Sequence, residues 1–181
     1  MSTGYQITEQ NTLHFVTFTI VDWVDLFTRK LYRDIIIDAF NFHIKNRGLD
    51  VYGYVIMSNH VHAMLHQPDG NLFDTIRDFR KYTARKIIEA VKQEPESRRE
   101  WMLENFRKAA AAHPKSGEFK FWQDGYHPVE LYSAEFTKQK LNYIHNNPVE
   151  ELLVQYPWEY MFSSARNYAD MDSLLEVIKI S

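Results

Sequence analysis

Apolar positions along the chain follow two different periods, and the change from one to the other marks the expected elements. β-Branched and aromatic residues dominate 13–21 and 51–57, and 60–66 is apolar apart from its histidines, which predicts three strands. Apolar residues recur every three or four positions over about 30–47 and 72–91, which predicts two amphipathic helices. The first half of the chain therefore reads strand, helix, strand, strand, helix.

The second half repeats the strand–helix order after a polar interruption. Ser133 is a favourable N-cap for a helix that we expect to run to about Asn147, because Pro148 pushes the residue before it out of the helical region. The remaining segments follow from the same patterns: a helical insertion over 92–117, a strand at about 126–132, and a C-terminal extension over 149–181.

This order of elements predicts the fold class. It is the split β-α-β arrangement of an α/β (α+β) protein with a ferredoxin-like or RRM-like antiparallel sheet, with helices packed on one face. The chain has 181 residues and contains no internal repeat and no Pro/Gly-rich linker, so we expect a single domain spanning 1–181.

The composition limits which kinds of metal site and covalent cross-link the chain can form and indicates its cellular compartment. The chain has no cysteine, which excludes disulfides and thiolate metal sites and fits the reducing cytoplasm. Its N-terminus lacks a basic segment followed by an apolar one, and no apolar run approaches the roughly 20 residues that span a bilayer. We therefore expect a cytoplasmic protein with no membrane partner.

The formal net charge of −3 argues against broad electrostatic attraction to nucleic acid, but it hides a local basic segment. Residues 71–92 carry six Lys/Arg against three Asp/Glu. Arg77, Lys81 and Arg85 recur at four-residue spacing and so form one stripe, which either contacts phosphates or is merely solvated. Tyr82 lies among these cations and is either a surface aromatic or a residue that stacks on a base.

Two histidines interrupt the strand predicted over 60–66. His60 and His62 are two residues apart, so their side chains point to the same face, and two neighbouring imidazoles on a rigid strand can close on one metal ion. The alternative is a pair of partly buried histidines bonded to the backbone. Metal ligation is favoured because both rings share a face and a third ligand candidate exists.

That third candidate lies on the helix that follows Ser133. Tyr143 and Asn147 are one helical turn apart and share a face with Lys140. Taken alone, the pattern is typical of a tyrosine at the edge of the core beside an asparagine C-cap. The functional interpretation is a phenol nucleophile with a neutral oxygen ligand one turn away. Because a phenol has a pKa of about 10, its electrophile must then be activated, as a divalent metal does to a phosphodiester.

Five motifs in order carry a resemblance to a known family. They are His60-Val61-His62 after a Met-Ser-Asn, then Phe79 to Arg85, Phe121-Trp122-Gln123, Tyr143 to Val149, and Ser163 to Tyr168. Together they resemble the REP-associated tyrosine transposases, a branch of the HUH single-tyrosine transposases, over about residues 10–170. The insertion at 92–117 is longer than the compact family pattern, and Glu150-Glu151 follows Val149 where relatives often have a basic residue and a glycine.

The resemblance implies a metal-dependent nickase and strand transferase that acts on single-stranded or hairpin DNA. It implies Mg²⁺ or Mn²⁺ bound by His60 and His62, with Asn147 in the place of the third ligand. Tyr143 would attack the scissile phosphate and form a 5′-phosphotyrosine link. Lys140 and the cationic stripe of 71–92 are the expected DNA contacts.

Two other functions remain open at this stage. One is a non-catalytic nucleic-acid-binding regulator with the same fold, and the other is a metal-dependent phosphodiesterase that uses activated water. The sequence also leaves open whether the chain acts as a monomer or as a homodimer.

Overall fold

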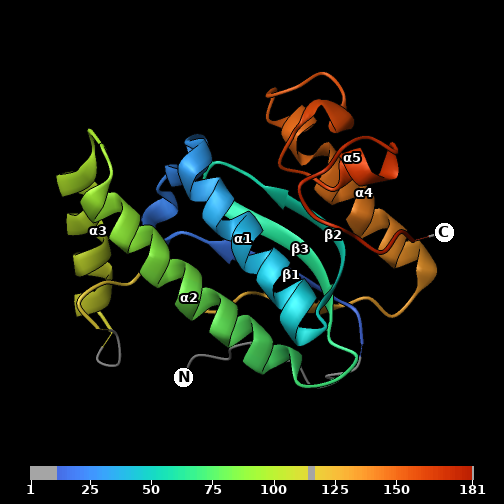
Figure 1. Ribbon diagram of the computed structural model, residues 1–181, viewed down its shortest axis with the longest axis horizontal. Coiled ribbons are helices and arrows are strands. Elements are labelled where there is room, and N and C mark those ends of the chain that lie inside the picture. The colour runs from blue at the N-terminus through green and yellow to red at the C-terminus, as the bar shows by residue number, and fades with distance from the viewer. Residues whose placement is uncertain (1–11, 114–116, 181) are drawn as a thin grey trace.

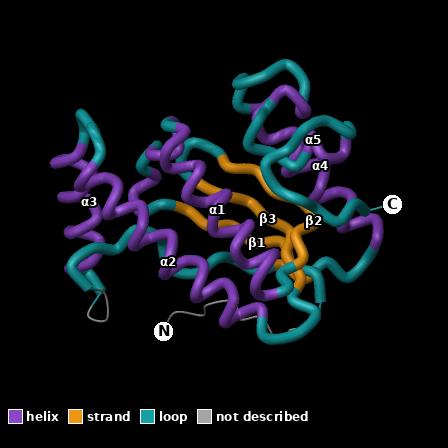
Figure 2. Tube along the Cα trace, viewed as in Figure 1, coloured by secondary structure: helices purple, strands orange, loops and turns teal. Residues whose placement is uncertain are grey.

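The computed structural model describes residues 12–113 and 117–180 (Figure 1). Its described part contains one antiparallel sheet of four strands in the order β2-β3-β1-β4, which Figure 2 shows as the central layer. The strands are β1 His14–Thr19, β2 Asp50–Ile56, β3 His60–His66 and β4 Val129–Glu130. The predicted α/β class with an antiparallel sheet is confirmed. The expectation that helices pack on one face only is wrong, because buried side chains on both faces of the sheet pack against helices.

The helices follow the predicted order and add short turns. They are α1 Lys30–Arg47, α2 Leu72–Gln93, α3 Arg99–Ala111, α4 Ala134–Glu150 and α5 Ala165–Tyr168, with single 3-10 turns η1 Val21–Trp23, η2 Leu26–Thr28 and η3 Pro157–Glu159. Within the described residues, no helix combines the length and apolar character needed to cross a bilayer.

The two faces of the sheet are covered by different helices. Side chains alternate along β3, so Val61, Ala63 and Leu65 pack into the main core with α1 and α2. Met64 points the other way and packs, together with Phe15 of β1, against α4. Figure 1 shows α1 and α2 in front of the sheet, with α4 and α5 beside β2. One face is therefore the core of the domain, and the other face carries the histidine pair beneath α4.

Two boundaries differ from the sequence prediction. α4 runs to Glu150 and contains Pro148, so the predicted end at Asn147 is wrong. Pro148 lies in the last turn, where its missing N–H removes one hydrogen bond, and the backbone N–H of Glu151 still donates to the carbonyl of Asn147 at 3.1 Å. β4 is shorter than the predicted 126–132 because His127, at φ 43°, interrupts the extended backbone. The carbonyl of Tyr126 still accepts the backbone N–H of Thr17 on β1 at 2.9 Å.

Gly53 sets how closely α4 approaches β2. A Cβ atom at this position would lie 2.8 Å from Cδ1 of Leu141 on α4, so any other residue would force that leucine to move. Leu141 and Ile144 are the buried side chains by which α4 joins this smaller core. The absence of a side chain at Gly53 thus allows α4 to pack this close to the sheet.

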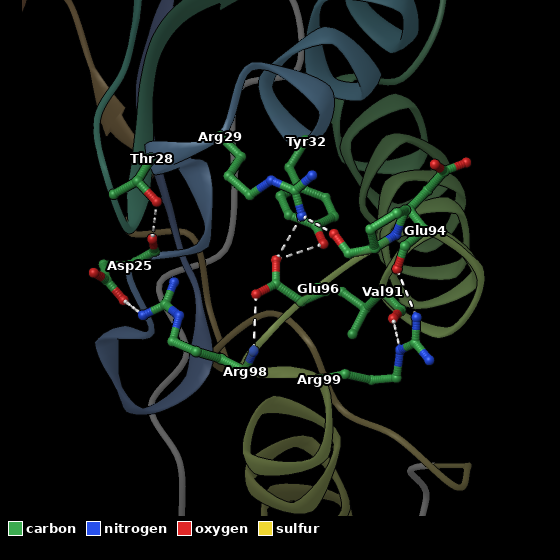
Figure 3. A network of polar contacts seen from close by, with 10 residues as sticks. Asp25, Thr28, Arg29, Tyr32, Val91, Glu94, Glu96, Arg98 and Arg99 are labelled. Carbon is green, nitrogen blue, oxygen red and sulfur yellow. Dashed lines mark hydrogen bonds and ion pairs between the residues drawn. The ribbon is translucent and has the colours of Figure 1, made fainter.

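The predicted insertion is tied to the body of the domain by a polar network that Figure 3 shows from close by. The carboxylate of Glu96, whose side chain is 3% exposed, accepts hydrogen bonds from Nη1 of Arg29 at 2.9 Å and from the hydroxyl of Tyr32 at 3.1 Å. The backbone N–H of Arg98 donates to it at 3.0 Å. Burial, followed by the nearby charge of Glu96, raises the pKa of Tyr32 to about 12, so its hydroxyl remains a donor.

Replacing Glu96 tests this attachment. Glu96→Ala leaves the buried hydroxyl of Tyr32 without its acceptor, and we expect a loss of about 2–3 kcal/mol in the free energy of unfolding. Glu104→Ala on α3, whose carboxylate is 53% exposed beside Lys108, is the matched control and should cost less than about 1 kcal/mol. Urea unfolding measures both, and equal midpoints for the two variants would contradict the role given to Glu96.

Candidate active site

The two histidines at the start of β3 lie side by side on the sheet face beneath α4. The ring centroids of His60 and His62 are 4.6 Å apart. His62 is 6% exposed and stacks on Phe15, with ring centroids 5.2 Å apart. The shared face expected from their spacing is therefore observed.

Each imidazole is held through its Nδ1 atom by an oxygen of the protein. Nδ1 of His60 lies 2.7 Å from Oδ1 of Asn59, and Nδ1 of His62 lies 2.8 Å from Oγ1 of Thr17. An amide oxygen only accepts, so Nδ1 of His60 carries the proton and its Nε2 keeps a lone pair. A donated Nδ1–H with a free Nε2 is the arrangement typical of metal-binding histidines.

Thr17 was missed by the sequence reasoning because its role depends on strand register. It lies on β1, directly opposite His62 in the antiparallel pairing of β1 with β3. Threonine is common in strands, so the residue type alone gives no signal. Asn59 could have been found, since it precedes His60 in the chain.

Both histidines are neutral at ordinary pH. Burial, followed by the neighbouring charges of His60 and Lys140, lowers the pKa of His62 to about 3. Burial also lowers the pKa of His60, and the carboxylate of Glu151 opposes that shift only in part. A neutral imidazole is the form that binds a metal ion.

α4 places Tyr143 over this pair. The phenol oxygen of Tyr143 is 3.5 Å from Nε2 of His62, and the two ring centroids are 5.3 Å apart. Tyr143 is 42% exposed, so the residue lies at the surface of the site. Nζ of Lys140, one turn earlier, lies 5.7 Å from the centre of the Tyr143 ring and 4.9 Å from that of Phe15.

The last of the five sequence motifs, Ser163 to Tyr168, holds α4 in this position. Nε2 of His145 lies 2.9 Å from Oγ of Ser164, and that oxygen also accepts the backbone N–H of Tyr54 on β2 at 2.9 Å. The hydroxyl of Tyr168 donates to the carbonyl of Tyr52 at 2.9 Å. His145, which had no predicted role, therefore joins the helix of the nucleophile candidate to the edge of the sheet.

Asn147 is 7% exposed and lies one turn beyond Tyr143 on α4. This places its amide on the buried part of the helix that carries Tyr143. Its role as the third ligand stays a prediction.

The basic stripe on α2 does not belong to the site. α2 covers the opposite face of the sheet, where Phe79 packs into the main core with Val61. Arg77 is paired with Asp74 at 2.5 Å and with Asp78 at 3.0 Å, which neutralises one of the predicted phosphate contacts. Four predicted DNA contacts lie on this helix, Arg77, Lys81, Tyr82 and Arg85, while Lys140 lies beside Tyr143. DNA contact by the four residues on α2 remains a prediction, and it would involve a surface separate from the site.

The side chains at this site suit a divalent ion, but they supply only part of its coordination shell. Two neutral imidazoles with anchored Nδ1 atoms supply nitrogen ligands, and Asn147 could supply an amide oxygen. Over residues 12–113 and 117–180, no cluster of three or more His, Cys, Asp or Glu side chains could hold a metal ion. Remaining positions would thus be filled by water or by oxygens of a phosphate.

The depressed histidine pKa values predict a pH-dependent stability. Burial lowers the pKa of His145 to about 4, and that of His62 is lowered to about 3, against about 6.5 in the unfolded chain. Below pH 6.5 the unfolded state therefore binds protons that the folded state does not. Stability is full above about pH 6.5 and falls toward pH 4, by up to about 1.4 kcal/mol per pH unit for each group.

Urea midpoints at pH 7, 6 and 5 measure this loss. His145→Gln removes the contribution of one group, so its midpoint should fall less steeply with pH than that of the wild type. His113→Gln, in which the side chain replaced is 45% exposed, is the control and should keep the wild-type slope. A wild-type midpoint that is unchanged from pH 7 to pH 5 would contradict the burial of these imidazoles.

Comparisons with known proteins identify the fold. Neither the protein-family profiles nor the curated proteins contain a match to this sequence. Among solved structures, the chain is similar to a REP-associated tyrosine transposase bound to a REP hairpin, with a TM-score of 0.63 and 16% identity over 100% of this chain and 96% of that one. A structure from Deinococcus radiodurans, described as a candidate transposase, aligns over 81% of this chain and 97% of its own with 18% identity and a TM-score of 0.45.

The first of these similarities spans the insertion as well as the sheet, because it covers the whole chain. The resemblance that the sequence motifs indicated is thus confirmed for the fold: this chain has the fold of a REP-associated tyrosine transposase.

Proposed function

We propose that this protein is a transposase-type enzyme that nicks and rejoins single-stranded or hairpin DNA, with Tyr143 as the nucleophile. The observation that carries the proposal is the 3.5 Å approach of the Tyr143 hydroxyl, from α4, to Nε2 of His62, from β3. These two residues are 81 positions apart in the chain, and they meet on the sheet face opposite the main core.

The site supports a phosphoryl-transfer role for Tyr143 over a structural one. A tyrosine that only closes the core would be buried, whereas Tyr143 is 42% exposed over two neutral imidazoles. The ammonium group of Lys140 lies on the same side and supplies a positive charge for a phosphate. The REP hairpin bound to the similar structure supports DNA as the ligand class for this chain also.

The reaction needs no external energy source, because the phosphoester bond that breaks is replaced by a phosphoester bond to tyrosine. The Tyr143 oxygen attacks the scissile phosphorus and loses its proton to water, the bond from phosphorus to the 3′ oxygen breaks, and that oxygen takes a proton to become a 3′-hydroxyl. The product is a 5′-phosphotyrosine ester. Attack by a 3′-hydroxyl on the same phosphorus reverses these steps and rejoins the strand.

His60, His62 and Asn147 would hold the Mg²⁺ or Mn²⁺ ion. When bound, such an ion polarises the phosphodiester and offsets the charge that develops on its oxygens. Thr17 and Asn59 contribute by fixing the imidazole orientations through Nδ1. Lys140 orients the phosphate over Tyr143.

A covalent-adduct assay tests the nucleophile. The protein is incubated with Mn²⁺ and 3′-end-labelled DNA hairpins that have randomised single-stranded flanks, so that the label stays on the strand joined to tyrosine, and the products are separated on a denaturing gel. We expect an adduct that disappears in Tyr143→Phe and in His62→Ala. Tyr82→Phe, which changes the tyrosine of the basic stripe on the opposite face, should retain it.

Each other outcome assigns a different function. An adduct that survives in Tyr143→Phe would exclude Tyr143 as nucleophile. Strand cleavage without any adduct would indicate a phosphodiesterase that uses activated water. Binding of the hairpins without cleavage would indicate a non-catalytic regulator.

Thr17→Val tests the positioning of the metal ligand. The substitution keeps the side-chain shape and removes the oxygen bonded to Nδ1 of His62, so we expect the Kd for Mn²⁺ to rise about 10- to 100-fold. Thr75→Val on α2, which removes a hydroxyl that donates to Oε1 of Gln67 at 3.0 Å away from the histidine pair, is the matched control and should change the Kd less than about threefold. Calorimetric titration with Mn²⁺ measures both, and equal affinities would remove Thr17 from the site.

A further inference from the structure

Trp23 is exposed in a backbone conformation that tryptophan rarely adopts. Its side chain is 66% exposed, although the residue lies in η1 at the end of β1. Asp22 and Trp23 have φ of 52° and 50°, in the left-handed region that costs an L-residue about 1–2 kcal/mol. Such strain is typical of functional positions, and here it turns a large aromatic ring toward solvent.

Asn59 connects Trp23 to the histidine pair. Nδ2 of Asn59 donates to the carbonyl of Trp23 at 3.3 Å, while Oδ1 of the same amide accepts from Nδ1 of His60 at 2.7 Å. The backbone N–H of Ile20 donates to the carbonyl of Asn59 at 3.0 Å, which fixes the amide against the end of β1. Asn59 therefore links the strained turn at Trp23 to His60, the first predicted metal ligand.

Trp23 also borders a cavity of about 390 Å³. This volume is within the range of about 300–1,000 Å³ that is usual for small-molecule sites. One wall is apolar and comes from Ala109 of α3 and from Ala112, the residue that caps this helix. The other wall is polar and includes Gln123 and Lys120, whose side chain is 10% exposed.

The polar wall can bond the edge of an uncharged ring. Nε2 of Gln123 donates to the carbonyl of Ile20 at 3.3 Å, so its Oε1 is the atom of that amide able to accept from a ligand. Lys120 is paired with Asp124 at 2.7 Å, and His113 lies 3.3 Å from the same carboxylate. Asp124 thus balances the charge of Lys120, and Asp22 adds a second carboxylate to the lining, so the cavity suits an uncharged nucleobase better than a second phosphate.

We propose that this cavity is a nucleobase pocket, in which one unpaired base of the DNA strand stacks on Trp23 and presents its polar edge to Gln123. The pocket rests on the proposed function, since it deepens the single-strand specificity of the same site. A stacking face on a base is free only where the base is unpaired or extruded from a duplex. Trp23 therefore selects single-stranded DNA next to the phosphate that Tyr143 attacks.

The pocket also gives the helical insertion a role. α3 and its C-cap contribute Ala109 and Ala112 to the apolar wall, and the backbone N–H of Lys120 donates to the carbonyl of Phe106 on α3 at 3.0 Å. The insertion, which the network around Glu96 anchors, therefore completes a wall that the four-stranded sheet alone does not supply.

Binding of a labelled dT15 oligonucleotide in EDTA tests the pocket separately from the chemistry. Loss of one stacked base is worth a factor of about 5 to 100 in affinity, so we expect Trp23→Ala to raise the Kd about tenfold or more. Trp23→Phe keeps an aromatic face and should remain within about threefold of the wild type. Trp101→Ala removes a tryptophan that is 51% exposed on α3 outside this cavity, and it should leave the Kd unchanged.

Intrinsic fluorescence supplies a second readout. Saturating dT15 should quench the wild type and Trp101→Phe, because a base stacks on Trp23 in both. Trp23→Phe should bind with nearly normal affinity and lose that quenching, which a merely structural role for Trp23 would not produce. Thermal melts of each variant establish that the fold is intact.

The outcomes separate the two proposals. Equal affinities for the wild type, Trp23→Ala and Trp101→Ala, with a covalent adduct at Tyr143, would overturn the pocket and leave the proposed function standing. A Trp23-dependent affinity without any adduct would keep the pocket and overturn the nicking activity. Failure of the wild type to bind dT15 would overturn the pocket, and the covalent adduct at Tyr143 would still decide the nicking activity.

Discussion

The alternation of side chains along β3 is the constraint on which the core and the site both depend. Val61, Ala63 and Leu65 anchor the strand in the main core, and the intervening residues His60 and His62 are thereby fixed on the other face. A register shift of one residue would exchange the two sets and destroy both. Rigidity in the imidazole pair is therefore a consequence of hydrophobic packing on the opposite side of the same strand.

α4 completes the site through a few contacts of modest strength. The absence of a side chain at Gly53 lets the helix approach β2, and the bond from His145 to Ser164 fixes it there. The exposed phenol of Tyr143 is then held over His62, with no bond of its own shorter than 3.5 Å in the described residues. Such a loosely held hydroxyl suits a group that must move onto a phosphorus atom and later leave it.

Much of this arrangement follows from sequence pattern, and the exceptions have physical causes. The limits of β3 and the shared face of its histidines depend on local periodicity alone, so they were predictable. Thr17 was not, because its bond to His62 depends on strand register. The location of the α2 stripe was not predictable either, because periodicity says which side of a helix is polar but not which face of the sheet the helix covers. Trp23 gave no signal because its exposure comes from two left-handed residues.

The central claim is that Tyr143 becomes joined to DNA at the histidine pair, and peptide mapping of the covalent product tests it most directly. After DNA cleavage in Mn²⁺, nuclease trimming and trypsin digestion, tandem mass spectrometry locates the nucleotide-linked residue. We expect a nucleotide mass on Tyr143, in the peptide that begins after Lys140 and ends at Arg166. A nucleotide on Tyr82, in the peptide that ends at Arg85, or on Tyr156 or Tyr160 would contradict it.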